Sequence, residues 1–356
     1  MLDFDFMPSH DDVMATGSDD CTVKLWGIQA GASGHIEAPI TEPLADMHGH
    51  QRKVTHVKFH PTASNVLAST SADNTIMIWD VEKGECKSTL SGFDNLVSDM
   101  DWSHNGAEFA ATCKDKNLRI FDARVNTAVQ TVQCHDGSKT AKLTYLGKRG
   151  TLVTTGFTKQ SKRQIKIWDP RNLTDPLKAL DVDQAAGVMM PFFDDSLNIL
   201  YVAGKGDGNI RYFEIVDDAP FIHSISEHRS STSTKGCAFL PKRTCDTTKC
   251  EIARCLKLTN QAIEPLSFIL PRKSDMFQAD VFPDTNSGAA VLTADQYFSG
   301  SNVEAPPTMS MRPGAEAKQE EKAAPVMMKS AAQLQRELDA ANKRIAELEA
   351  QLAAKA

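Results

Sequence analysis

Residues 68–80 read ASTSADNTIMIWD, and this stretch decides the fold. Small residues lead into Ala72-Asp73-Asn74, whose aspartate and asparagine have the chemistry of a tight turn. Apolar residues then alternate from Thr75 to Trp79 with the period of two that is typical of a strand. The stretch therefore predicts a turn followed by a short strand that ends on an aromatic residue.

The same pattern recurs along the chain, which makes it a repeat rather than a single hairpin. Its aromatic position is filled by Trp26, Trp79, Phe121, Trp168 and Phe213, which lie 42–53 residues apart. WD repeats have a period of roughly 40–45 residues. Short strands with turns at fixed offsets, and no helical periodicity, indicate four-stranded blades around an axis. The sequence therefore predicts an all-β, WD40-type β-propeller.

The second repeat is the most complete, with Gly49-His50, Ser69, Asp73 and Trp79. An indole, a hydroxyl, an imidazole and a carboxylate can satisfy one another's hydrogen bonds inside a blade, where water cannot reach them. The His–Ser–Asp combination also suggests a hydrolase triad. A triad would not repeat, however, whereas this frame returns in the first repeat at Thr16, Asp20 and Trp26. We therefore expect the set to be structural.

The start of the chain departs from this frame. Aligning Phe6-Met7-Pro8 with Phe59-His60-Pro61 places Met1 opposite Val54, so the Gly-His signal of the first repeat would precede Met1. A propeller normally closes by pairing its ends, which leaves no open strand edge. The sequence thus predicts an incomplete first blade and incomplete closure.

Composition narrows the function classes. The 356 residues carry a net charge of −7, which argues against a generally basic nucleic-acid-binding surface. No apolar run is long enough to span a membrane. The eight cysteines include no CxxC pair, so reduced thiols are expected, and the five-residue spacing of Cys245, Cys250 and Cys255 does not suit zinc. Neither a phosphate-binding glycine loop nor a catalytic constellation is visible, so we expect no cofactor and no enzyme.

Four longer stretches and a tripeptide are more specific than the repeat itself. They are TTGFTKQSKRQIKIWDP at 154–170, GKGDGNIRYFEI at 204–215, Pro241-Lys242-Arg243, KCEIARCLKL at 249–258 and LPRKSDMFQADVFPDT at 270–285. Over residues 1–310 the chain resembles the coronin family. The resemblance implies a seven-bladed propeller that binds filamentous actin in the cytoplasm, in the actin cytoskeleton, and acts with the complex that branches actin filaments.

The resemblance and the composition together divide the chain into four parts. We expect a propeller over 1–261, an extension that packs back on its underside over 262–302, a flexible linker over 303–329 and a coiled coil over 330–356. Since actin filaments are acidic, binding by an acidic chain must use local basic patches. The candidate contacts, each weighed against an ordinary solvated loop, are Lys159, Lys162, Arg163, Lys242, Arg243, Arg272 and Lys273.

The C-terminal segment carries a heptad seam. Apolar residues recur in alternating steps of four and three, with Leu338, Ile345 and Leu352 at a and Leu334, Ala341 and Leu348 at d. Arg344 and Glu349 fall at g and the following e, in a pattern associated with parallel trimers. A lone helix packed on the propeller is the alternative. We expect self-association, with a trimer favoured and a tetramer or dimer still open.

These observations favour a scaffold that binds actin filaments and cross-links or regulates them through several joined propellers. The alternative is a WD-repeat adaptor whose propeller binds protein partners other than actin. Co-sedimentation with filaments would separate the two.

Overall fold

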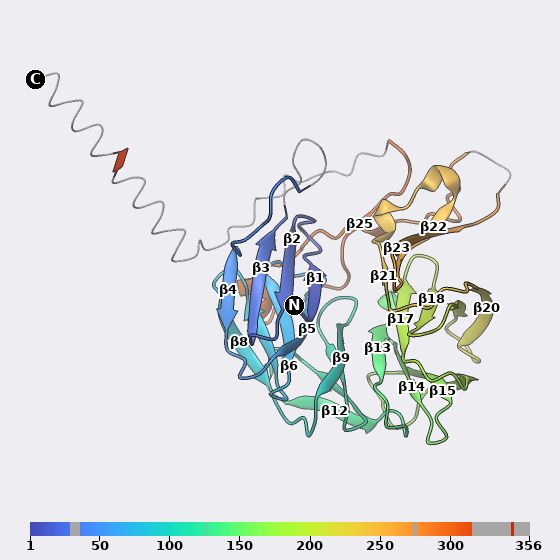
Figure 1. Ribbon diagram of the computed structural model, residues 1–356, viewed down its shortest axis with the longest axis horizontal. Helices are drawn as coiled ribbons and strands as arrows, with labels where there is room; N and C mark the ends of the chain where they lie inside the picture. The colour runs from blue at the N-terminus through green and yellow to red at the C-terminus, as the bar shows by residue number, and fades with distance from the viewer. Residues whose placement is uncertain (29–35, 126, 273–275, 315–342, 345–356) are drawn as a thin grey trace, which may run out of the picture.

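A computed structural model of the chain describes residues 1–28, 36–125, 127–272, 276–314 and 343–344. Six antiparallel sheets, five of four strands and one of three, stand around a common axis (Figure 1). The first strands of successive sheets neighbour one another, so they are the innermost. The expected all-β propeller is therefore confirmed, and the described residues form six blades.

The strands of each blade follow one another from the axis outward. Blade one contains β1 (Asp3–Phe6), β2 (Val13–Gly17), β3 (Thr22–Gly27) and β4 (Ala45–His48). Blade two contains β5 (Val54–Phe59), β6 (Val66–Ser71), β7 (Ile76–Asp80) and β8 (Glu85–Leu90). Blade three contains β9 (Val97–Trp102), β10 (Phe109–Cys113), β11 (Asn117–Phe121) and β12 (Ala128–Gln133).

The second half repeats this arrangement. Blade four contains β13 (Lys142–Tyr145), the 3-10 helix η1 (Gly147–Arg149), β14 (Leu152–Phe157), β15 (Arg163–Trp168) and β16 (Lys178–Asp183). Blade five contains β17 (Met189–Asp194), β18 (Ile199–Gly204), β19 (Ile210–Ile215) and β20 (Ile222–His228). Blade six contains β21 (Gly236–Phe239), the 3-10 helices η2 (Lys242–Thr244) and η3 (Thr247–Lys249), β22 (Glu251–Leu258) and β23 (Ile263–Ile269).

Two features differ from the sequence-based outline. Although an incomplete first blade was predicted, β1 pairs with β2 over its whole length and gives this blade four strands. The sheet of blade six extends to Ile269, beyond the expected propeller boundary at residue 261, because β22 and β23 form one hairpin. Within the described residues, no strand of blade one pairs with a strand of blade six.

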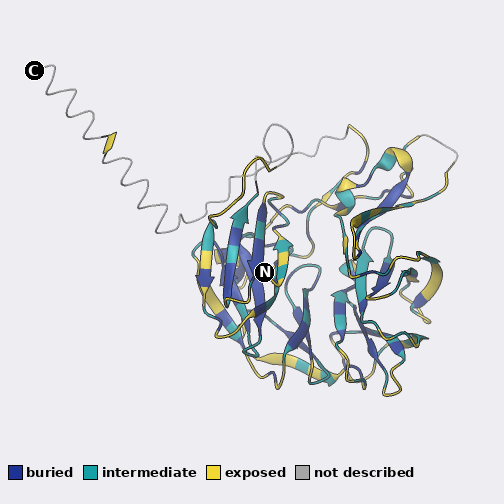
Figure 2. Cartoon of the chain, in the orientation of Figure 1, coloured by how far each residue is buried: buried dark blue, intermediate teal, exposed yellow. Residues whose placement is uncertain are grey.

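Burial follows the blade order, with buried residues concentrated in the middle strands and exposed ones on outer strands such as β12 and β20 (Figure 2). Blade two illustrates why. Leu67 on β6 and Trp79 on β7 pack with Val13 and Leu25 of blade one, so the core lies between neighbouring sheets. This packing repeats from blade to blade and leaves the connecting loops on the two ends of the propeller.

The two ends of the propeller differ. We call one the turn face: it bears the hairpins between the second and third strands and the loops that join successive blades. Its loops are 18–21, 49–53, 72–75, 91–96, 114–116, 134–141, 158–162, 184–188, 205–209, 229–235 and 259–262. We call the opposite end the extension face, because the segment after blade six runs across it.

The extension is anchored at successive blades. It contains β24 (Thr285–Asn286), the short helix α1 (Ala294–Phe298) and β25 (Thr308–Met309). Thr285 hydrogen-bonds Ser196 of blade five at 3.0 Å, and the Ser64 amide of blade two donates to the Leu292 carbonyl at 2.8 Å. Tyr297, which is 1% exposed, packs against His60 with ring centroids 4.5 Å apart and the rings tilted by 59°. The extension therefore covers loops of several blades on this face.

Candidate interaction surface

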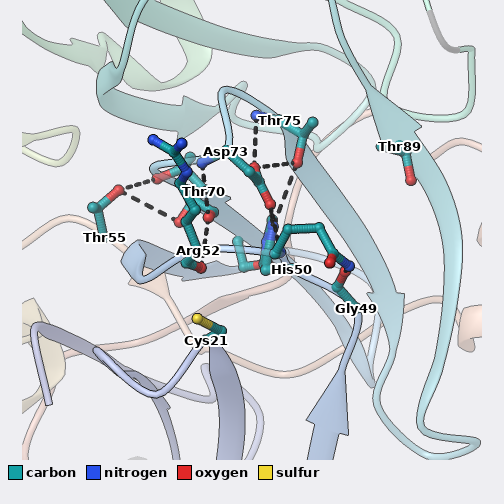
Figure 3. A network of polar contacts seen from close by, with 12 residues as sticks. Cys21, Gly49, His50, Arg52, Thr55, Thr70, Asp73, Thr75 and Thr89 are labelled. Carbon is teal, nitrogen blue, oxygen red and sulfur yellow. Dashed lines mark hydrogen bonds and ion pairs between the residues drawn. The ribbon is translucent and has the colours of Figure 1, made fainter.

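His50, Ser69, Asp73 and Trp79 of blade two form one hydrogen-bonded network, of which Figure 3 labels His50 and Asp73. His50 Nδ1 lies 3.0 Å from the Asp73 carboxylate and its Nε2 lies 2.7 Å from Ser69 Oγ. The indole N–H of Trp79 donates to the same Ser69 oxygen at 2.8 Å. The loop before β5, the strand β6 and the turn before β7 are thus joined inside one blade.

The electrostatics of this network suit a structural role. Burial lowers the pKa of His50, so its imidazole is neutral and Nδ1–H donates to Asp73. Burial opposes ionisation of Asp73, but hydrogen bonds led by that from Thr75 lower its pKa overall. Ser69 is fully buried and accepts a hydrogen bond from the indole, so its hydroxyl is closed to a substrate. The four side chains join parts of one blade, and the Ser69 hydroxyl does not resemble an accessible nucleophile.

Blade one repeats part of this arrangement. Trp26 donates to Thr16 Oγ1 at 2.9 Å, and Asp20 accepts from the amide and hydroxyl of Thr22. Blade three replaces the network instead. Phe93 packs beside Phe121 with ring centroids 5.6 Å apart. The Arg119 guanidinium lies 5.0 Å from the Phe93 ring centroid, a cation–π contact.

Blade four contains a histidine that the sequence analysis missed. His135 Nε2 lies 3.0 Å from Thr154 Oγ1, which also accepts from the Trp168 indole at 2.9 Å. A signal was present, because His135 precedes Thr154 by 19 residues, the same separation as His50 and Ser69. Trp168 obscured it, since the longer turn places it 14 residues after Thr154 instead of 10.

The predicted basic contacts do not form one patch. Lys159, Lys162 and Arg163 lie at the turn face, in and after the hairpin between β14 and β15. Lys242, Arg243 and Arg272 lie toward the extension face, because η2 joins the first two strands of blade six and Arg272 follows the end of its third strand. Lys273 lies outside the described residues.

Arg163 and Lys242 are held inside the fold. The Arg163 side chain is 1% exposed and binds Asp183 at 2.5 Å and Asp207 at 2.6 Å, which joins blades four and five. Lys242 Nζ lies 2.5 Å from Asp194 and donates to the Ile252 carbonyl at 2.6 Å. The sequence could not show this for Arg163, because a residue at the start of a strand points inward or outward according to register.

Two other predicted contacts are partly engaged. Arg243 Nη2 lies 2.5 Å from Asp11 Oδ1, so this ion pair links blade six to the first loop of blade one. Arg272 pairs with Asp280 at 2.9 Å and stays 44% exposed. At the turn face, Lys162 lies 3.7 Å from Asp181, whereas Lys159 is exposed in the turn.

The turn face carries more basic side chains than the sequence analysis proposed. Within its described loops, the exposed basic residues outside any described ion pair are Arg52, Lys53, Lys114, Lys139, Lys159, Lys205 and Lys235. The exposed carboxylates of the same loops are Asp19, Asp20, Asp94 and Asp136. This end of the propeller is therefore net basic although the chain as a whole has a net charge of −7.

Carboxylates on the inner strands clamp neighbouring blades. Asp3 and Asp5 of β1 accept hydrogen bonds from the Val57 and Phe59 amides of β5 at 3.0 and 2.8 Å. Asp99 and Asp101 of β9 do the same for the amides of Leu143 and Tyr145 in β13, at 2.9 and 3.0 Å. Each clamp satisfies amides of an inner strand that its own sheet does not use.

These clamps line a cavity of about 950 Å³ along the axis. Lys58 and Lys142 lie between the acidic strands, with Lys142 Nζ 3.2 Å from Asp99. Burial raises the pKa of Asp3 to about 6 and lowers that of His56 to about 4. Among the residues that the structure describes, no group of three or more His, Cys, Asp or Glu side chains could hold a metal ion.

The expected coiled-coil seam lies outside the described residues, and of its flanking pair Arg344 is described whereas Glu349 is not. Arg344 is helical and exposed, as is its neighbour Lys343. The stoichiometry of this segment stays a prediction. A search of the described part of the chain finds no helix long and apolar enough to cross a membrane.

Comparison with protein families supports the assignment of WD repeats. The WD domain, G-beta repeat, matches residues 2–27, 41–80 and 84–122, and a second type of WD40 repeat matches residues 263–305. A crystal structure of the WD40 domain of Toxoplasma gondii coronin superposes with a TM-score of 0.83 at 35% identity, over 88% of this chain and 80% of that one. A chain of a mitotic checkpoint complex, 18% identical with a TM-score of 0.56, shares the fold alone.

Curated relatives carry the same name. Coronin-A of Dictyostelium discoideum is 42% identical over 314 residues, which is 88% of this chain and 69% of that protein. The coronin-like protein crn1 of Schizosaccharomyces pombe is 41% identical over 85% of this chain and 50% of its own length, and human coronin-2A is 38% identical over 89% and 61%. The chain thus spans about half to two thirds of the length of these relatives. Since it covers more than two thirds of a relative with 42% identity, and its propeller matches a coronin propeller, the chain belongs to the coronin family.

Proposed function

We propose that this chain is an actin-filament-binding scaffold of the coronin type, without enzymatic activity, and that its turn face binds the filament. The observation that carries the proposal is the set of exposed, unpaired basic side chains on that face of an otherwise acidic protein. The opposite face is occupied by the chain's own extension, which packs on loops of blades two, three and five. Family membership supports actin as the partner.

Charge explains how such a face would work. A filament surface is acidic and repeats along its length, so a basic face raises the encounter rate and favours one orientation of the propeller. Exposed charges are screened beyond about 10 Å at 0.1 M salt. We therefore expect binding to weaken steeply as the salt concentration rises.

Self-association would add avidity. We propose that residues 330–352 join propellers as a parallel trimer, so that one assembly reaches several sites on one filament or on two. Cross-linking of filaments would follow from that geometry, and contact with the filament-branching complex and residence in the cytoplasmic actin cytoskeleton would follow from the family. A dimer or tetramer would keep the avidity and change only its extent.

Co-sedimentation with actin filaments at low salt tests the proposal. The variant Lys159→Glu/Lys205→Glu reverses two charges on neighbouring blades of the turn face. A control, Lys148→Glu/Lys249→Glu, reverses two exposed lysines toward the extension face, of which Lys249 pairs with Asp246 at 3.1 Å. We expect the first pair to lower affinity at least about tenfold, which is about 1.4 kcal/mol, and the control to change it little.

The outcomes separate the alternatives. An equal loss in both variants, or a greater loss in the control, would reject the turn face as the binding surface. If the folded parent stayed wholly in the supernatant, the adaptor hypothesis would replace actin binding.

A further inference from the structure

Blade six contains a pair of cysteines whose positions no repeat signature explains. Cys237 lies on β21 opposite Lys257, and Cys255 lies on β22 opposite Phe239, so the two cysteines are diagonal neighbours across one antiparallel pair. Both belong to the apolar cluster that packs against Tyr201 and Ile210 of blade five, so they share one face of the sheet. The two thiols influence each other: their mutual interaction is the main cause that raises the pKa of Cys237 and lowers that of Cys255.

We propose that Cys237 and Cys255 form a redox-responsive dithiol that a hydroperoxide converts to an intrachain disulfide. No metal or cofactor is needed, because the hydroperoxide is the two-electron oxidant. The proposal rests on the placement of the two side chains, on a neighbouring cation and on a route for the oxidant.

The neighbouring cation is Lys257. Its side chain is fully buried, and Nζ donates to the Thr232 carbonyl at 2.6 Å. The hydrogen bond from Cys237 lowers the pKa of Cys255, burial opposes this, and the charge of Lys257 adds to the lowering. The same interaction raises the pKa of Cys237, so the pair loses its first proton at Cys255. Thiolate character is what makes a cysteine reactive toward an oxidant.

The route is the axial cavity. Cys237 lines this cavity of about 950 Å³ and is partly exposed, whereas Cys255 is fully buried one strand away. A small hydroperoxide can therefore meet Cys237 first. The Cys255 thiolate takes the Cys237 proton as the Cys237 sulfur attacks the terminal oxygen, the O–O bond breaks, that proton passes to the leaving oxygen, and a sulfenic acid remains on Cys237. Cys255 then attacks that sulfur, the S–S bond forms and water leaves with the hydroxyl oxygen.

The strand geometry allows the bond to close. Diagonal Cα atoms in a sheet lie about 7–8 Å apart, slightly beyond the usual disulfide range of about 4.4–6.8 Å, so β21 must move toward β22. β21 is an edge strand, with β22 as its sheet partner on one side. A bond that requires such a shift is easily reduced, as regulatory disulfides are.

The remaining cysteines provide internal controls. Cys245 also lines the cavity, but burial raises its pKa and it lies beyond β21, near η2. Cys134 is buried and burial raises its pKa to about 12, so it should not react. Cys86 is exposed on β8, and it reports unspecific oxidation of an accessible thiol.

Peptide mapping of the full chain tests the proposal. The protein is treated with a few equivalents of hydrogen peroxide, remaining thiols are alkylated, and the chain is digested with trypsin without reduction. We expect peptides 236–242 and 255–257 to appear as one cross-linked species, lighter by two hydrogen atoms, while the other six cysteines are alkylated. Dithiothreitol added before alkylation should restore both thiols.

Two variants keep the test decisive. In Cys255→Ala the resolving thiol is absent, so Cys237 should be trapped by a sulfenic-acid reagent, and Cys86→Ser should form the cross-link as the parent does. The proposal is overturned if Cys86 oxidises while peptides 236–242 and 255–257 stay reduced. It is equally overturned if Cys237 links to Cys245, or reaches the sulfinic acid in the parent without a cross-link.

Discussion

Replacing Ser69 with alanine removes a single oxygen atom, yet it should destabilise the propeller strongly. Ser69 Oγ accepts from the Trp79 indole at 2.8 Å and donates to His50 Nε2 at 2.7 Å. The variant leaves both nitrogens without a partner, in a site where Ser69 is 0% and Trp79 is 1% exposed. Each unsatisfied buried group costs about 1–3 kcal/mol, so we expect the two together to lower the free energy of unfolding by about 2–6 kcal/mol.

The matched control is Thr16→Val in blade one. Thr16 Oγ1 accepts from Trp26 at 2.9 Å in the same frame, but Trp26 is half-buried, so its N–H can turn to water. Valine keeps the volume of threonine and removes the hydroxyl. We expect a loss of about 1 kcal/mol, the usual net contribution of one hydrogen bond.

Urea unfolding followed by tryptophan fluorescence and circular dichroism measures both variants. For a domain of this size, about 2–4 °C of Tm accompanies each kcal/mol, so thermal melts provide a second readout. Equal losses in the two variants would refute the reasoning, since burial of the orphaned groups would then be irrelevant. A folded Ser69→Ala protein that selectively lost filament binding would refute the structural role of the network.

Three further predictions follow from other parts of the chain. His60 Nδ1 accepts two backbone N–H groups, and burial lowers the pKa of His60 to about 3. Below pH 6.5 this histidine therefore binds a proton in the unfolded chain but not in the folded chain, which lowers the free energy of unfolding as the pH falls. His60→Gln should reduce that loss between pH 7 and 5 by about 2 kcal/mol, measured by urea unfolding. Tyr297→Ala should remove about 3–5 kcal/mol of packing and expose the extension to limited proteolysis, and unchanged cleavage would contradict its anchoring role. Leu348→Asp should place an unpaired charge in the heptad seam and dissociate the assembly in sedimentation equilibrium, whereas a monomeric parent would reject the coiled coil.

The fold was predictable because its signals are local. The aspartate turn and the strand before Trp79 lie within a few residues of each other, and so does the corresponding pair in blade one. His135 escaped because the tryptophan of its blade follows a longer turn, although its distance to Thr154 was unchanged. A search that anchored each repeat on the histidine as well as the aromatic would have found it.

The candidate surface was less predictable, because composition does not show which way a side chain points. Arg163 was expected to be exposed with Lys159, yet strand register turns it into the ion pairs between blades four and five. Lys242 and Arg243 share a short basic motif but lie at the other end of the propeller. The basic residues that gather on the turn face come from loops far apart in sequence, so the three-dimensional structure was needed to reveal them.

The carboxylate clamps also bear on how the chain folds during synthesis. Asp3 and Asp5 bind amides 54 residues further along, and Asp99 and Asp101 bind amides 44 residues further along. Each clamp thus needs only the next repeat, and the entropy of closing so short a loop differs little from one joint to the next. A ribosome releases the N-terminal part first. The nascent chain can therefore fasten blade two to blade one, and blade four to blade three, as each emerges, without waiting for the C-terminal segment.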